Sequence, residues 1–162
     1  MPYQTTGILT ESDLQKQRLL PSKKRFEKGP VVIVECVEKI PCNPCVEACP
    51  KKAITIEGDI TNIPQVNFDI CNGCTVCIAR CPGLAIFVVH KNYNKKEAAI
   101  SLPYEFVPRP QKGDIVKALD RSGKVVCNVR IEKVLDAKAV DRCAVVTILI
   151  PKKYYNKVRF IK

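Results

Sequence analysis

The chain has 162 residues, of which 27 are basic and 16 acidic, and it carries ten cysteines but only one histidine. A Rieske-type centre, which needs two histidines on one iron, is therefore excluded, and no apolar run approaches the ~18 residues of a membrane-spanning helix. The formal net charge of +11 is unevenly spread, since residues 31–90 sum to −2 and residues 91–162 to +10.

Residues 1–30 form an N-terminal arm in our domain prediction. The stretch Thr10-Glu-Ser-Asp13 predicts the capped start of a short helix that runs through Leu14 and ends at Pro21. Ser22-Lys-Lys-Arg25 predicts a basic turn. Two interpretations stay open at this stage: a disordered tail, or an arm that lies along a partner subunit.

Residues 31–90 hold eight of the ten cysteines in two runs. The upstream run is Cys36-x₅-Cys42-x₂-Cys45-x₃-Cys49-Pro50, and the downstream run is Cys71-x₂-Cys74-x₂-Cys77-x₃-Cys81-Pro82. The downstream spacing is the one in which bacterial proteins hold iron–sulfur clusters. Structural zinc sites more commonly use two C-x₂₋₄-C pairs, so the pattern favours a cubane cluster over zinc.

A shift of 32 residues lays the downstream run onto the upstream one, which indicates two related structural units. The copy is imperfect because Cys71 falls on Lys39, and an ammonium group cannot replace a thiolate on iron. Cys36 is the candidate for the missing ligand, with the first gap widened from two residues to five. The alternative is that Cys36 is a buried strand cysteine and that the upstream site holds a [3Fe-4S] cluster.

With these motifs, residues 31–90 resemble a bacterial-type ferredoxin domain with two [4Fe-4S] clusters. In such domains the fourth cysteine of each run binds the other cluster. The resemblance therefore implies two ligand sets: Cys71, Cys74, Cys77 and Cys49 for cluster one, and Cys36, Cys42, Cys45 and Cys81 for cluster two. It also implies that residues 54–60 and 64–71 form a hairpin linking the two halves.

The widened upstream run is similar to ferredoxin-like subunits of flavin-dependent amino-acid or amine dehydrogenases, of the proline or hydroxyproline dehydrogenase type. That resemblance implies a flavoprotein dehydrogenase subunit as partner and a hetero-oligomer. Ten cysteines could also suggest a secreted disulfide scaffold. The ordered cluster spacing and the polar start of the chain argue instead for a protein of the reducing cytoplasm, with no signal peptide and no membrane span.

The C-terminal part of the sequence predicts β-structure. Residues 91–111 read as a proline-containing linker that could include a strand at 98–102, and residues 114–119, 124–135, 142–150 and 157–161 read as strands. Several short strands within about fifty residues suggest a small closed barrel. The predicted fold class is thus α+β: a two-cluster ferredoxin-like domain with a pseudo-two-fold repeat at 31–90, followed by a basic all-β, barrel-like module at 112–162.

The sequence shows no catalytic motif, so we expect a non-catalytic subunit without a catalytic site of its own. The favoured function is an electron-transfer subunit of a multi-subunit oxidoreductase, which passes single electrons between a flavoprotein and an acceptor. Two alternatives remain: a free two-cluster ferredoxin, or an iron–sulfur protein that binds nucleic acid through its basic C-terminal module. Nucleic acid is the least favoured partner, because a basic excess is more often a solvated or protein-docking face.

Overall fold

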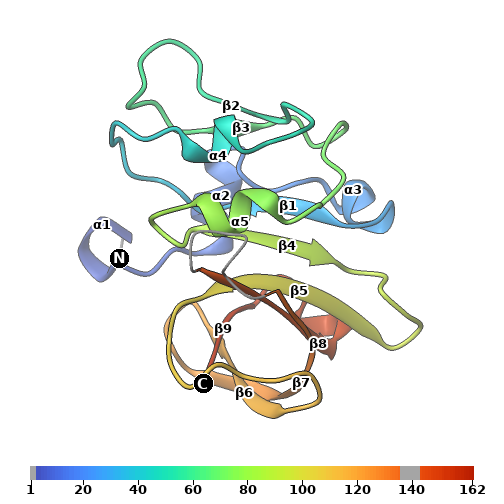
Figure 1. The fold of residues 1–162 in the computed structure, drawn as a ribbon. Helices are drawn as coiled ribbons and strands as arrows, with labels where there is room; N and C mark the ends of the chain where they lie inside the picture. Colours follow the sequence, from blue (N-terminus) through green and yellow to red (C-terminus); the bar gives the residue numbers. More distant parts are fainter. Residues whose placement is uncertain (1–2, 136–142) are drawn as a thin grey trace.

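The computed structural model describes residues 3–135 and 143–162, which form short helices and one large sheet (Figure 1). The α-helices of this part are α1 Tyr3–Thr6, α2 Glu11–Lys16, α3 Lys23–Glu27, α4 Pro44–Glu47 and α5 Val76–Arg80. The strands are β1 Val31–Val34, β2 Ile54–Thr55, β3 Gln65–Val66, β4 Ile86–His90, β5 Glu97–Tyr104, β6 Ile115–Asp120, β7 Val125–Leu135, β8 Ala144–Pro151 and β9 Val158–Ile161. Among the described helices, none has both the length and the apolar character needed to cross a membrane.

Seven of the strands form one antiparallel sheet in the order β1-β4-β5-β8-β7-β6-β9. Its last five strands curl into a half-barrel, and β9 returns toward β5 (Figure 1). The remaining two strands, β2 and β3, pair with each other as an antiparallel hairpin above the sheet. This pairing agrees with the hairpin that the ferredoxin resemblance implied between the two halves of residues 31–90.

Strands β1 and β4 are buried on both faces, which explains why their sequences are almost continuously apolar. Successive side chains of a strand point to opposite faces. Val31 and Ile33 join the core inside the barrel, whereas Val32 and Val34 join a second core on the side of the cysteines. The two strands are therefore a shared wall between the barrel and the cysteine-rich layer.

The predicted combination of short helices, strands and a barrel-like C-terminal part is confirmed, but the barrel is not a separate sheet. Strand β5, which lies within the predicted linker, pairs with β4 on one side and β8 on the other. The turn chemistry of residues 92–96 closes a hairpin between β4 and β5, so it joins the two parts instead of separating them. The predicted domain boundaries remain predictions, and Arg142, the first residue of one predicted strand, lies outside the described residues.

The N-terminal arm packs against its own chain. As predicted, α2 begins with a capping box, in which Thr10 accepts from the Asp13 amide and Asp13 accepts from the Thr10 amide. The predicted end at Pro21 was wrong, because α2 ends at Lys16. Leu14 and Leu19 are fully buried. The prediction of a basic turn at 22–25 was wrong. The Ser22 hydroxyl instead caps the short helix α3, and this helix places Phe26 in the barrel core.

Candidate iron–sulfur centres

The first candidate centre is a small cavity lined by four thiols. These come from the loop after α4, from the loop that precedes α5 and from α5 itself: Cys49, Cys71, Cys74 and Cys77. Val32, Ile54 and Val88 supply apolar walls, so β1 and β4 form the floor of the cavity. Cys74 is exposed, and this places one edge of the centre at the surface.

The second candidate centre is a similarly small cavity, again lined by four thiols: Cys36, Cys42, Cys45 and Cys81. Val34 and Ile86, the next inward-facing residues of β1 and β4, supply its floor. Ile40 closes the outer side and is itself 48% exposed. The same pair of strands thus supports both centres.

Each cavity receives three cysteines from one run and the fourth from the other run, which is the grouping that the ferredoxin resemblance implied. Cys36 lies with the second quartet in spite of the widened gap, and Lys39 lines neither cavity. Within residues 3–135 and 143–162, no three His, Cys, Asp or Glu side chains form a site for a single metal ion. The ligand assignment itself stays a prediction.

The internal repeat places matching backbone turns beside the two crossing cysteines. Lys52 and Leu84, which are 32 residues apart, have the left-handed φ values of 50° and 52°. Each turn directs the following amide at a sulfur: Ala53 donates to Cys49 Sγ at 3.2 Å, and Ala85 donates to Cys81 Sγ at 3.4 Å. Such N–H···S bonds stabilise the thiolate and help to set the potential of a bound cluster.

Gly73, between Cys71 and Cys74, has no room for a side chain. Its φ is +66°, and an added Cβ would lie 2.6 Å from the Cβ of Pro30. Only glycine adopts this conformation readily and permits such a close approach. The first loop of the downstream run is thereby pressed against the residue that precedes β1.

The buried thiols of the two quartets, Cys45 and Cys77, resist ionisation. Burial, followed by the neighbouring thiols Cys74, Cys71 and Cys49, raises the pKa of Cys77 to about 12. Burial, followed by the thiols of the second quartet, raises the pKa of Cys45 to about 11. Bound iron would supply the positive charge that lets such groups exist as thiolates.

Both cavities fit a cubane cluster by their donor set. Each offers four soft sulfur ligands beside apolar residues of β1 and β4. Iron–sulfur clusters exchange single electrons, at potentials that depend on hydrogen bonds to sulfur and on solvent exposure. The arrangement can therefore hold two such groups side by side along one wall.

Arg25 of α3 binds the loop that carries Cys71 of the first centre, and this role was missed at the sequence level. Its guanidinium donates to four carbonyl oxygens: those of Phe68 at 2.6 Å, Gly29 at 3.3 Å, Pro30 at 3.1 Å and Cys71 at 2.7 Å. One side chain thus joins the arm, the start of β1 and the loop that carries Cys71. A basic turn in the sequence gives no sign of this role, because the four carbonyls come from segments far apart in the chain.

Glu35, the residue before Cys36, was also missed. It is buried and bound by Arg121 and Arg159 of the barrel. One signal for such an interaction is present in the sequence, because Arg159 lies within the otherwise apolar strand Val158–Ile161. A charged side chain that is almost fully buried needs a partner of opposite charge.

The two cysteines outside the quartets lie in the barrel strands or beside them. Cys143 is buried directly before β8, and Cys127 of β7 is half-buried and packs against the barrel core. Burial raises the pKa of both thiols. Both therefore pack as small apolar side chains.

Comparison with known proteins identifies the cysteine-rich layer. The family model for the 4Fe-4S dicluster domain matches residues 35–85. Residues 35–85 form a 4Fe-4S dicluster domain. With its eight cysteines, the domain carries two [4Fe-4S] clusters, as the sequence predicted.

Several relatives share this domain. The ferredoxin-type protein NapF of Haemophilus influenzae is 39% identical over 59 residues, which cover 34% of this chain and 34% of NapF. One chain of the polysulfide reductase of Wolinella succinogenes is 49% identical over 45 residues, or 28% of this chain and 22% of that protein. A Halobacterium salinarum protein provisionally named as an iron–sulfur subunit of dimethyl sulfoxide reductase is 31% identical over 105 residues, or 62% of this chain and 34% of that protein.

The chain therefore spans about a third or less of the length of these relatives. No solved structure matches it. The dicluster domain is thus related to iron–sulfur components of reductases, and the comparisons do not reach as far as one particular dehydrogenase complex.

Proposed function

We propose that this chain is an electron-transfer subunit of a multi-subunit oxidoreductase, in which its two clusters pass single electrons between a flavoprotein dehydrogenase subunit and an acceptor. The observation that carries the proposal is the pair of four-thiol cavities on one wall of β1 and β4. Two one-electron centres built into the same rigid layer form a relay. The names of the related proteins, which include components of two reductases, support a role within a complex.

The flavoprotein partner follows from redox chemistry. A flavin can accept two electrons from a substrate and release them singly, and iron–sulfur clusters accept them one at a time. The partial likeness of the widened upstream run to dehydrogenase-associated ferredoxins points the same way. The donor would be a separate subunit in a hetero-oligomer, and the thiol-rich sites suit the reducing cytoplasm.

The surface near each centre offers a route for electrons. Cys74 is exposed beside cluster one, and Lys51 lines the same cavity. Ile40, half-exposed, covers cluster two. A relay needs one cluster accessible to a donor and the other accessible to an acceptor, and both centres lie close enough to the surface for either role.

The test is an anaerobic native purification of the protein from its own cells, with the co-purifying proteins identified and the visible spectrum recorded. A yellow-brown complex that contains a flavoprotein, whose flavin is oxidised as the clusters are reduced on addition of substrate, is the expected result. A brown monomer with two clusters and no partner would favour a free ferredoxin. Retention on nucleic acid that weakens steeply with salt would favour the nucleic-acid alternative.

A further inference from the structure

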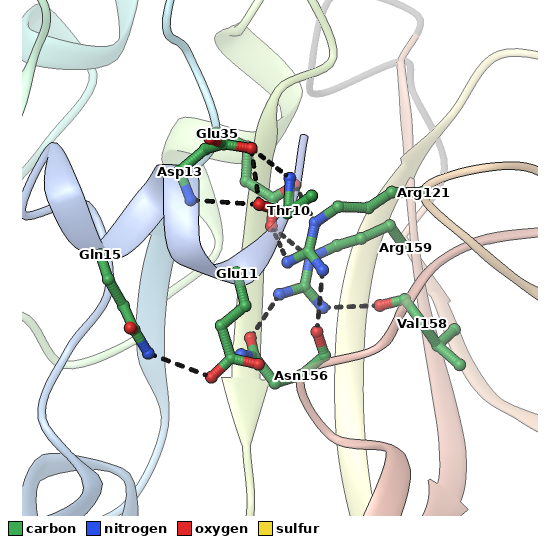
Figure 2. A network of polar contacts seen from close by, with 9 residues as sticks. All are labelled: Thr10, Glu11, Asp13, Gln15, Glu35, Arg121, Asn156, Val158 and Arg159. Carbon is green, nitrogen blue, oxygen red and sulfur yellow. Dashed lines mark hydrogen bonds and ion pairs between the residues drawn. The ribbon is translucent and has the colours of Figure 1, made fainter. Parts of the chain in front are cut away.

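A buried ionic network joins the barrel to the dicluster domain (Figure 2). Arg121, in the turn between β6 and β7, donates hydrogen bonds to both carboxylate oxygens of Glu35. Its Nη2 lies 2.6 Å from Oε1 and its Nε lies 2.8 Å from Oε2. Arg159 of β9 donates from Nε to the same Oε1 at 2.5 Å. The Glu35 and Arg159 side chains are only 6% and 4% exposed.

The rest of the network fixes the two guanidinium groups. Arg159 donates to Asn156 Oδ1 at 2.8 Å and to the Val158 carbonyl at 2.7 Å, and Arg121 donates to the Asn156 carbonyl at 3.1 Å. Glu11 of α2, which accepts a hydrogen bond from Gln15 in Figure 2, is a further charged group that acts electrostatically on Arg159. Because each guanidinium has several partners, its position is determined by the barrel and not by Glu35 alone.

Glu35 is linked to two of the predicted ligands of cluster two, to one by the chain and to the other by hydrogen bonds. Its own chain neighbour is Cys36. Its amide donates to the Ala85 carbonyl at 2.7 Å, and the Ala85 amide in turn donates to Cys81 Sγ at 3.4 Å. A displacement of Glu35 would therefore move Cys36 directly and Cys81 through Ala85.

Cys36 has particular need of such support. Five residues separate it from Cys42, whereas two separate Cys71 from Cys74, so the loop to the next ligand constrains Cys36 less. At cluster one, the corresponding first ligand is held through its carbonyl by Arg25. At cluster two, within the described residues, the charged side chains that hold the segment of the first ligand come from the barrel.

We propose that Arg121 and Arg159 act through Glu35 as positioning residues for cluster two and raise its reduction potential. This gives the barrel a role inside the chain, and it rests on the proposed ligand set of cluster two but not on the identity of any partner. Reduction adds a negative charge to the cluster, so a nearby cation favours the reduced form and a nearby carboxylate opposes it. The two kinds of group must therefore shift the potential in opposite directions.

The experiment compares Arg121→Met and Glu35→Gln in the holoprotein, with redox titrations followed by EPR. Cluster two is assigned from the Cys71→Ala variant, which is expected to keep that cluster alone. We expect the equilibrium constant for reduction of cluster two to fall up to about tenfold in Arg121→Met and to rise up to about tenfold in Glu35→Gln, which is about 59 mV each way. The reduction potential of cluster one should not change.

Lys124→Met is the matched control, because Lys124 is an exposed cation of the same β6–β7 turn. It should change neither potential. Equal shifts at both clusters, shifts of the same sign in the two test variants, or no shift at all would overturn the proposal. If Glu35→Gln fails to fold, Arg121→Met and its conservative partner Arg121→Lys decide: the lysine variant should recover part of the lost potential, and failure to do so would also overturn it.

If Cys71→Ala and Cys36→Ala both retain the full iron content of two clusters, the ligand assignment is wrong. In that case the failure lies with the proposed cluster sites. If both variants behave as expected but the potentials do not shift, the sites stand and the role of the barrel is refuted. The two failures are thus distinguishable.

Discussion

The two cluster sites of this protein share one wall and one repeat but are held in place by different parts of the chain. At cluster one, Arg25 of the N-terminal arm binds the Cys71 carbonyl, and Gly73 lies against Pro30. At cluster two, barrel arginines bind Glu35 beside Cys36. Sequence repetition therefore accounts for the quartets and their N–H···S bonds, while the outer support of each site comes from a different addition to the dicluster domain.

This difference shows how an irregular copy can remain functional. The upstream run has a lysine at position 39, and Cys36, just beyond the end of β1, lies with the second quartet instead. A ligand at a strand end is held by the sheet on one side only. The Glu35 network supplies the second attachment, and it comes from strands that a simple ferredoxin-like domain would not need.

The largest expected effect comes from removing the first ligand of either site. Cys36→Ala and Cys71→Ala should each lose one cluster and keep the other, so that iron falls from about eight to about four atoms per chain. Iron analysis and EPR of the purified variants provide the measurement. Retention of about eight irons by Cys36→Ala would show that Cys36 is not a ligand. Loss of both clusters in either variant would show that the two sites are not independent.

A second, smaller effect is expected from Gly73→Ala. The new Cβ would meet the Pro30 Cβ at 2.6 Å and would sit at a positive φ, so we expect a loss of about 2 kcal/mol in the free energy of unfolding. Cluster one should be lost first during chelation by a competing iron ligand. Gly83→Ala is the control, because its Cβ would meet nothing within 4 Å and its φ is not in the left-handed region. Similar losses in both variants would remove the close approach as the cause.

Arg25→Ala tests whether the arm supports cluster one selectively. Four carbonyls would lose a charged donor, and we expect a destabilisation of about 2 kcal/mol together with faster loss of cluster one on exposure to a chelator. Arg25→Lys should recover little, since one ammonium group cannot reach all four oxygens. The neighbouring Lys24→Ala, on the exposed side of α3, should behave as the unaltered protein. If Arg25→Ala lost cluster two faster than cluster one, the arm would not be the selective support of cluster one.

The smallest effect is expected from Thr10→Ala, which removes the capping box of α2. Loss of an N-cap costs about 1 kcal/mol, and the melting temperature should fall accordingly. Neither reduction potential should change, because the cap lies outside both supports. A selective change at one cluster would indicate that α2, through Glu11, takes part in the network around Arg159.

Much of the cluster chemistry was predictable because it is local in sequence. The spacing of Cys71, Cys74 and Cys77 fits one face of a cubane, and the 32-residue repeat identified the second site and the defect at Lys39. The barrel strands were predictable for a similar reason, since alternation and turn residues are properties of neighbouring positions. Even the helix cap at Thr10 was readable from four consecutive residues.

Contacts between distant segments were not predictable. The pairing of β5 with both β4 and β8, the four carbonyls that meet at Arg25, and the three-residue cluster of Glu35, Arg121 and Arg159 each join residues far apart in the chain. A charged residue in a sequence does not reveal whether it will be solvated or buried, because that depends on which surfaces close over it. The sequence by itself determined which cofactor this protein holds, and only the tertiary structure decided what steadies each cluster, because a side chain binds whichever groups the folded chain brings within its reach.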